Sequence, residues 1–493
     1  MNASISSLGS SRRFALSTLA LAAVLAGCAV GPTYQLPASA APAGWKEQPA
    51  ADGWLPAAPA DALDRGEWWK LFGDATLDEL AGRVQVSNQN IAAAVANYTQ
   101  AQALVREQRA GLFPSVSLDG SGRRSGTVGG NASASPSNAF GATLGASWTP
   151  DVWGRLRETV NSAQANAQAS EADLASARLS AIGDLATNYF SLREADAEIV
   201  LLDETILGYQ RAFEITSNRY AAGIAAQTDV LQAQTQLVNA KADRVGLQRT
   251  RATLEHAIAM LVGVAPADFS LPPARWTPTV PGVPTGVPST LLQRRPDIAA
   301  AERAVAAANA QIGIQRAAYF PNLSLGASVG SGGSSVADLF KASTLVWSLG
   351  LSVAQTIFDA GATAARVEEA QAAREGRVAV YRQTVLTAFQ TVEDQLTVLR
   401  TLQEQEPLRR EAVAAAERTA QQLLNRYREG QVGYTEVVTA QVSALSAQRA
   451  LLQLQVNRQL AAVTLVQALG GGWQAPWQEQ QQAPAQTLPQ SRP

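Results

Sequence analysis

The chain has 493 residues, a net charge of −2 and only 16% charged side chains, a length that suits two or three ordinary domains. Its lysines are few and scattered and no basic run occurs, so no nucleic-acid partner is expected. The single cysteine and the single histidine exclude intrachain disulfides and a cysteine- or histidine-rich metal cluster, and no catalytic site, metal or cofactor is predicted.

Residues 1–27 have the features of a lipoprotein signal peptide. Arg12-Arg13 precede an apolar run from Phe14 to Ala26, which is shorter than the ~20 residues that span a bilayer. The run ends in Leu-Ala-Gly-Cys, which resembles the bacterial lipobox. We predict that Cys28 becomes the first mature residue and carries a covalent lipid. Because Ala29 follows it in place of the aspartate that retains such lipoproteins at the inner membrane, we expect an outer-membrane anchor.

A period-two pattern predicts a β-hairpin at about 113–150. Between 140 and 148 every second residue is apolar and the others are Gly, Thr, Gly and Ser, as in a strand with one apolar face. An upstream strand begins at Ser115, and the Gly- and Ser-rich stretch at about 120–139 is expected to be a loop. Strands of about nine residues have the length of tilted transmembrane strands.

The rest of this half is predicted to be helical. One helix is expected from about Leu77 to Gly111, and a second from about Arg157 to Tyr220, a stretch without proline. At 1.5 Å per residue the second helix would be about 98 Å long. The sequence NRYAAG ends it, with Gly223 as a left-handed C-cap, and a return helix follows from about Thr228 to Leu261.

The chain repeats this pattern with an offset of 207 residues. NRYAAG at 218–223 matches NRYREG at 425–430, and Gly263 matches Gly470. A solenoid repeat would be far shorter, so the chain is predicted to be a duplicated half-protein. The predicted segments are a lipid-anchored N-terminal segment (28–76), repeat 1 (77–263), a proline-rich equatorial linker (264–296), repeat 2 (297–471) with a hairpin at about 320–358, and a disordered tail (472–493).

Four strands per chain cannot close a barrel, because about eight are needed, and open edges leave backbone groups unpaired in lipid. The predicted fold is therefore mainly α with a small β part. Three chains would form a trimeric, 12-stranded transmembrane β-barrel with four strands from each, continued by a long α-helical barrel. Such an assembly is a conduit.

Several stretches of the chain carry a family resemblance. They are CAVGPTY at 28–34, WWKLFGD at 68–74, LLQRRPDI at 291–298, FPNLSL at 320–325 and FDAG at 358–361. Together they resemble the outer-membrane factors, the TolC-like channels, and within them the OprM/NodT-type efflux lipoproteins. The resemblance implies a homotrimer in the outer membrane, lipid-anchored, with its helical barrel in the periplasm. It also implies a periplasmic adaptor protein and an inner-membrane transporter, such as an RND pump, that together expel drugs, toxic compounds or metals.

In that family the helical tips close the periplasmic entrance through a polar network. The tip tyrosine and glycine correspond to Tyr427 and Gly430, but Val432 and Thr439 stand where TolC itself has a basic and an acidic residue. Glu436 does match an acidic position of the family, and Asp229 is its counterpart in the first half. The candidate gate residues are Tyr220, Gly223, Asp229, Tyr427, Arg428, Gly430 and Glu436, with Arg219, Arg426 and Glu429 beside them. The plainer alternative is that these are solvated charges and packing residues at a helix turn.

Two other functions stay open at this stage. The same fold would serve as the outer-membrane exit of a type I secretion system, which differs in its upstream pump. Alternatively, the long helices with a lipid anchor would form a periplasmic structural lipoprotein or an adhesin without a pore. The two matched amphipathic hairpins argue against the second alternative, because a rod without a pore has no use for them.

Overall fold

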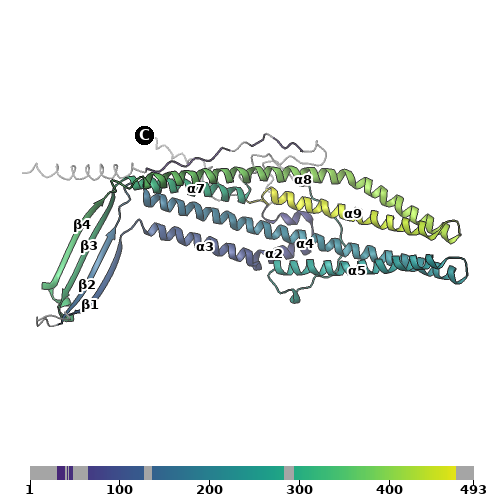
Figure 1. The fold of residues 1–493 in the computed structure, drawn as a ribbon, viewed down its shortest axis with the longest axis horizontal. Coiled ribbons are helices and arrows are strands. Elements are labelled where there is room, and N and C mark those ends of the chain that lie inside the picture. Colours follow the sequence, from purple (N-terminus) through teal and green to yellow (C-terminus); the bar gives the residue numbers. More distant parts are fainter. Residues whose placement is uncertain are drawn as a thin grey trace, which may run out of the picture. The chain divides into compact units, whose positions relative to one another are not determined.

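The computed structural model describes residues 30–38, 41–42, 44–47, 65–126, 136–282 and 294–473 (Figure 1). Its contacts divide the chain into two compact units. The sheet unit comprises Met1–Ala38, Asn97–Glu171 and Ala300–Tyr381. The hairpin unit comprises Ser39–Ala96, Ala172–Ala299 and Arg382–Pro493.

The helices confirm the duplication. They are α2 (Ala75–Ser87), α3 (Gln89–Ala110), α4 (Arg155–Ala221), α5 (Gln227–Leu261), α7 (Pro296–Arg316), α8 (Ala362–Arg428) and α9 (Tyr434–Ala468), with short 3-10 segments at Arg65–Phe72, Pro266–Asp268, Ala317–Tyr319, Val336–Phe340 and Ala342–Thr344. The pairs α3 and α7, α4 and α8, and α5 and α9 each begin 207 residues apart. The long helices α4 and α8 both span 67 residues, and the return helices both span 35. None of the described helices is both long and apolar enough to cross a bilayer.

The prediction of one helix from Leu77 to Gly111 is wrong at Asn88, where the backbone is extended between α2 and α3. The Asn88 side-chain oxygen accepts hydrogen bonds from the backbone N–H groups of Asn90 and Ile91, at 3.0 and 3.1 Å. Its amide nitrogen donates to the carbonyl of Leu261 at 2.8 Å. An asparagine that caps one helix and holds the end of another favours a break over a continuous helix.

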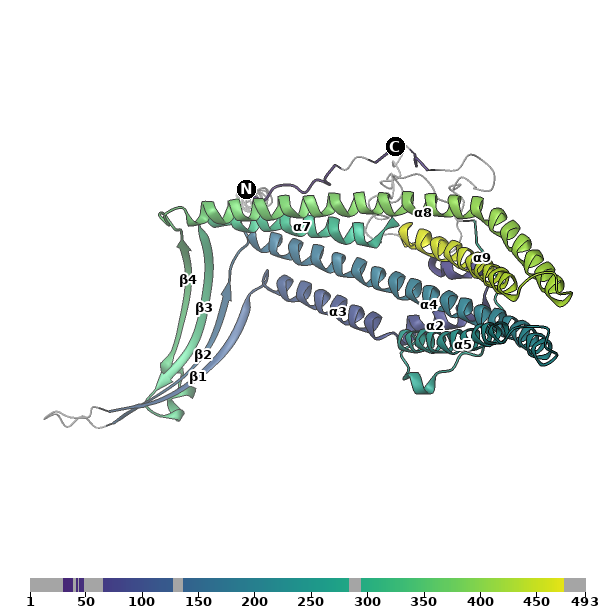
Figure 2. The same cartoon turned by 45° about the vertical axis from the view of Figure 1, so that its right-hand side comes forward.

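The sheet unit contains one antiparallel sheet in the order β1-β2-β3-β4 (Figures 1 and 2). The strands are β1 (Ser115–Ser125), β2 (Ser137–Trp148), β3 (Asn322–Gly333) and β4 (Leu345–Ala354). The loop expected at about 120–139 is wrong at both ends, because β1 continues through Gly120 to Ser125 and β2 begins at Ser137. Small Gly and Ser residues hide the period-two signal there, although the backbone ladder continues.

The two repeats join within this sheet through β2 and β3, which pair from Phe140↔Gly333 to Trp148↔Leu325. The outer strands β1 and β4 each pair on one side only within the described chain. On β4 the alternating residues Trp347, Leu349, Leu351 and Val353 are all more than 60% exposed. Each chain therefore presents an apolar strand face and two open edges, which isolated proteins avoid.

In the hairpin unit the C-terminal end of α5 contacts the junction between α2 and α3. The C-terminal end of α9 likewise contacts the residues just before α7. Gly263 has φ +73°, and a Cβ there would lie 2.2 Å from the carbonyl oxygen of Ser87. Gly470 has φ +91°, and a Cβ there would lie 2.1 Å from the carbonyl oxygen of Arg294. Only glycine fits both the left-handed conformation and this close approach, which explains why the repeat keeps it at both places.

The stretch RRPD has a structural role at the second of these junctions. Arg295 donates from Nη1 to the carbonyl of Ala468 at 3.0 Å, near the C-terminal end of α9. The same guanidinium pairs with Asp297 through two bonds of 2.9 and 2.6 Å. A cation at a helix C-terminus is favourable, so Arg295 takes the place that Asn88 has in repeat 1.

The extended N-terminal segment is held at defined points in each unit. In the sheet unit Tyr34 donates to the buried carboxylate of Glu302, and Asn309 donates to the carbonyl of Pro32 at 2.8 Å. In the hairpin unit the carboxylate of Glu393 accepts from the backbone N–H groups of Lys46 and Glu47, at 2.8 and 3.0 Å. Part of the predicted anchored segment is thus bound to the helices.

Candidate functional site at the hairpin tips

The tips of the two helical hairpins lie in the hairpin unit and have the same backbone geometry. Gly223 and Gly430 have φ +73° and +76°. In the first tip the N–H of Ile224 donates to the carbonyl of Arg219 at 2.8 Å, and in the second the N–H of Gln431 donates to that of Arg426 at 2.9 Å. These are left-handed C-caps that satisfy the last carbonyls of α4 and α8.

The two tip tyrosines have different environments. Tyr427 is 3% exposed, whereas Tyr220, at the equivalent place in repeat 1, is 46% exposed. Tyr427 packs on Tyr434 with ring centroids 5.2 Å apart, and both belong to a cluster of buried residues from the two repeats, which we name the tip cluster. Its members are Ala212, Ala233, Tyr427, Tyr434 and Val437. The tip cluster joins the two hairpins of one chain.

Arg219 of repeat 1 covers this cluster. Its guanidinium carbon lies 4.9 Å from the centroid of the Tyr427 ring, within the range of a cation–π contact. Its Nη1 donates to the carbonyl of Arg428, the last residue of α8, at 2.8 Å. One side chain therefore stacks on the tyrosine of the other hairpin and neutralises the negative end of its long helix.

Two buried polar atoms lie in or beside the tip cluster. The hydroxyl of Tyr427 and the Nε of Arg219 are buried without a hydrogen-bond partner among the described residues. Burial also raises the pKa of Tyr434, followed by the effect of the neighbouring Tyr427. Tyr434 therefore stays neutral at physiological pH, and Arg219 contacts the face of the Tyr427 ring.

The predicted acidic gate residues lie apart from this contact. Asp229 is partly exposed in the first turn of α5, and Glu436 is exposed in the first turn of α9. Acids there favour the helix N-terminus. In the described tips no ion pair joins them to Arg428 or to any other predicted gate residue. The Arg428 side chain is exposed, and its part in the contact is its carbonyl.

Sequence reasoning named Arg219 only as a companion of the other charges. Its partner Tyr427 is 208 residues further along the chain, and no local pattern reports a contact over that distance. The available signal is the repeated triplet Asn-Arg-Tyr at 218–220 and 425–427, which places an arginine next to each tip tyrosine. Cys28, residues 283–293 and residues 474–493 lie outside the described residues, so the lipidation of Cys28 stays a prediction.

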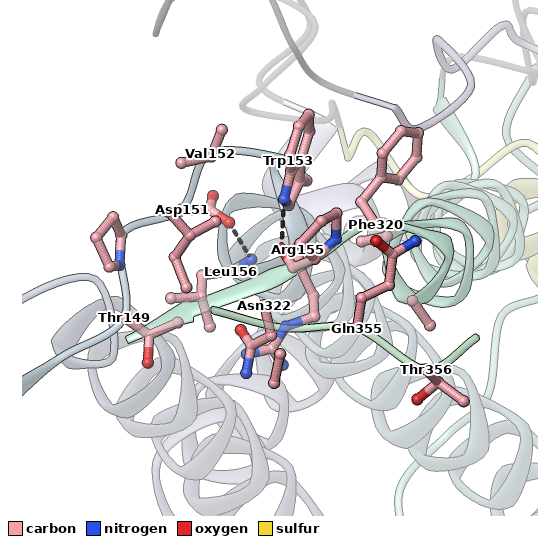
Figure 3. Close-up of a pocket in the computed structure, with 16 residues that line it drawn as sticks. Thr149, Asp151, Val152, Trp153, Arg155, Leu156, Phe320, Asn322, Gln355 and Thr356 are labelled. Carbon is pink, nitrogen blue, oxygen red and sulfur yellow. Dashed lines mark hydrogen bonds between the residues drawn. The ribbon is translucent and has the colours of Figure 1, made fainter. Parts of the chain in front are cut away.

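The sheet unit also contains a pocket lined by residues from both repeats (Figure 3). Trp153 stacks on Phe320 at 4.8 Å and donates from Nε1 to the carbonyl of Pro321 at 2.7 Å. Asp151 accepts from the backbone N–H groups of Leu156 and Arg157, at 2.8 and 2.9 Å. These groups cap α4 and join it to the FPNLSL stretch of repeat 2, so the pocket has a structural explanation.

Comparisons with known proteins agree with this arrangement. The family model "Outer membrane efflux protein" matches residues 80–264 and 287–471, one match for each repeat. The chain is 33% identical over 480 residues to a probable efflux pump outer membrane protein, TtgC, of Pseudomonas putida, which covers 96% of this chain and 98% of the relative. It is 30% identical over 458 residues to the cation efflux system protein CusC of Escherichia coli O6:H1, which covers 92% of this chain and 98% of CusC.

The solved structure of the outer-membrane channel OprN is similar over most of its length. The TM-score is 0.82 with 30% identity, and the match covers 91% of this chain and all of OprN. The unmatched part of the chain is shorter than either repeat, so the similarity extends to both.

Proposed function

Because the chain belongs to the outer membrane efflux protein family, we propose that three copies of this outer-membrane efflux channel protein form the exit duct of a tripartite pump. The observation that carries the proposal is the four-stranded sheet with open edges at β1 and β4. Three such sheets joined edge to edge give twelve strands, enough for a barrel with an open interior. The apolar residues exposed on β4 then face lipid.

The duct is passive in this proposal. Its family is one of channels, and we propose that the chain has no catalytic step and no cofactor beyond a lipid on Cys28. Its partners are a periplasmic adaptor and an inner-membrane transporter of the RND type. The relatives are named for efflux pumps and for cation efflux, so the proposed cargo is small molecules or cations, selected by the transporter.

The hairpin tips are the proposed periplasmic entrance. Arg219 connects the two hairpins of one chain, because it stacks on Tyr427 and donates to the last carbonyl of α8. A cation–π contact at a partly exposed site contributes about 0.5–1 kcal/mol, and a capping bond contributes a similar amount. These energies are small enough for an adaptor or a pump to overcome when it binds the tips.

The first test is negative-stain microscopy of protein extracted from outer membranes in detergent. A three-fold, stain-filled cylinder is the expected result. Monomeric rods, or a trimer without an axial cavity, would contradict the duct. In planar bilayers Arg219→Ala should then raise the single-channel conductance several-fold, while Arg211→Ala, an exposed arginine on the same helix, leaves it unchanged.

The same recording tests the predicted acidic gate. Asp229→Asn and Glu436→Gln remove the two acids that lie in equivalent first turns of α5 and α9. Higher conductance in these variants would support a polar gate that includes them. Unchanged conductance would remove both acids from the gate and leave Arg219 and Tyr427 as its residues.

A further inference from the structure

Each repeat has one arginine and one tyrosine at its tip, and the contact between Arg219 and Tyr427 uses one of each. With the offset of 207 residues, Arg219 corresponds to Arg426 and Tyr220 corresponds to Tyr427. Within one chain the arginine of repeat 1 lies over the tyrosine of repeat 2. The arginine of repeat 2 and the tyrosine of repeat 1 are left over.

Both remaining side chains are available at the surface of the single chain. Tyr220 is 46% exposed. Arg426 is exposed, and its described contact is a long hydrogen bond from Nε to the side chain of Gln431 at 3.4 Å in its own turn. An exposed aromatic ring and an exposed guanidinium at the ends of two neighbouring hairpins are chemically complementary.

We propose that Arg426 of one copy stacks on Tyr220 of the next copy and donates to the carbonyl of its Ala221. This contact copies the one that Arg219 makes with Tyr427 and Arg428, since Ala221 and Arg428 are the equivalent last residues of α4 and α8. The inference rests on the proposed trimer. Head-to-tail contacts of this kind close into a ring, here with three arginine–tyrosine contacts inside chains and three between them.

A second observation places a neighbouring copy on this side of repeat 1. Four apolar residues follow one another at intervals of seven from the tip along α5, and they are 53–66% exposed: Ile224, Leu231, Val238 and Val245. Residues seven apart lie on one face of a helix, so these four form one apolar row. Val438, the equivalent of Leu231, packs on the tip cluster within the chain. Leu231 is thus exposed where its equivalent Val438 is partly buried, and a second copy would cover it.

The contact between copies is more polar than the contact inside the chain. Tyr434 and Ala212 of the tip cluster have Gln227 and Thr419 as their equivalents. The boundary between copies therefore keeps the arginine–tyrosine stack and loses the second tyrosine and part of the apolar packing. The ring separates first at these three boundaries when the tips open.

Cross-linking between two differently tagged chains tests the contact. One chain carries Tyr220→Cys and the other Arg426→Cys, both are coexpressed at full length, and a short bismaleimide bridges the space of the lost arginine side chain. The expected product is a covalent species that carries both tags. Each variant expressed alone shows any reaction that comes from Cys28 or from like pairs. Arg219→Cys with Tyr427→Cys in one chain is the positive control, because the structure places that pair in contact.

The mass of the detergent complex separates the two ways to fail. A trimer that gives no two-tag product, while the positive control reacts, overturns the inference and leaves the duct intact. A monomer overturns the proposed trimer as well. In planar bilayers Arg426→Ala should raise the conductance several-fold, as is expected of Arg219→Ala, and Arg211→Ala should not. An unchanged conductance in Arg426→Ala would also overturn the inference.

Discussion

Glu194 shows how a single side chain in the hairpin unit responds to its place on a long helix. It lies on α4 one turn before Glu198, which pairs with Arg449 of α9 at 2.8 Å. Burial, and next the charge of Glu198, raises the pKa of Glu194 to about 7. A carboxyl group with a raised pKa stabilises the folded state while it is protonated, and this contribution is lost as the pH rises through the folded-state pKa.

The pH dependence follows from that sign. The thermal stability of the wild type should fall as the pH rises from about 4.5 to about 7, since Glu194 must ionise in a partly buried place. Glu194→Gln should remove this part of the pH dependence. Glu204→Gln changes an exposed acid on the same helix and should leave the slope as it is. Thermal unfolding in detergent at a series of pH values measures all three; equal slopes in the wild type and Glu194→Gln would contradict the assignment.

At the scale of the elements, glycines with positive φ follow the helices α4 and α5 of repeat 1. Gly263 and Gly223 have the same φ of +73°, but only Gly263 faces a carbonyl oxygen, that of Ser87. Each lies just after a helix of repeat 1, so the two differ in crowding and not in backbone conformation. Substituting each glycine by alanine therefore distinguishes the cost of a left-handed backbone from the cost of a steric clash.

Gly223→Ala should cost about 1–2 kcal/mol, the strain of a left-handed alanine. Gly263→Ala has the same strain and also brings a Cβ to 2.2 Å from backbone, so its destabilisation should be clearly larger and should loosen the meeting of α5 with α3. Thermal unfolding and hydrogen exchange of the segment around Asn88 measure the difference. Equal losses in the two variants would show that the junction yields without cost.

The elements that local signals define could be predicted from the sequence. The long helix α4 contains no proline, α8 continues through Pro407, and Gly223 and Gly430 follow their ends. The break at Asn88 was missed because its cause is a hydrogen bond to Leu261, far along the chain. The length of β1 was missed because its Gly and Ser residues carry no period-two pattern. At the candidate site the tyrosines and glycines were named, but the stacking of Arg219 depends on two segments brought together only by the fold.

At the scale of the whole molecule, the duplication fixes lengths. The two long helices have 67 residues each and the return helices 35 each, so the tips of both hairpins are reached after the same number of turns. Removing seven residues from α4 and the facing seven from α5 would shorten one hairpin by about 10 Å. Arg219 would then lie out of reach of Tyr427.

Deletions in one hairpin and in both hairpins should therefore differ. Shortening repeat 1 alone should expose Tyr427, and hydrogen exchange of the segment 423–434 should become faster. Shortening both repeats by the same heptads should restore slow exchange, because both tips move by the same distance. If the single deletion leaves the exchange of this segment unchanged, the match in length has no role in the tip contact.

The equal lengths have a consequence for how such a chain can diverge. A gain or loss of helical turns in one half is tolerated only when the other half changes by the same amount. The lengths of the two halves therefore evolve together. Point substitutions are free of this constraint. Tyr434 and its equivalent in repeat 1, Gln227, show that the two halves have diverged in sequence. Among descendants of one ancestor, we expect hairpin length to change in paired steps, and unpaired insertions to collect in the linker between the halves.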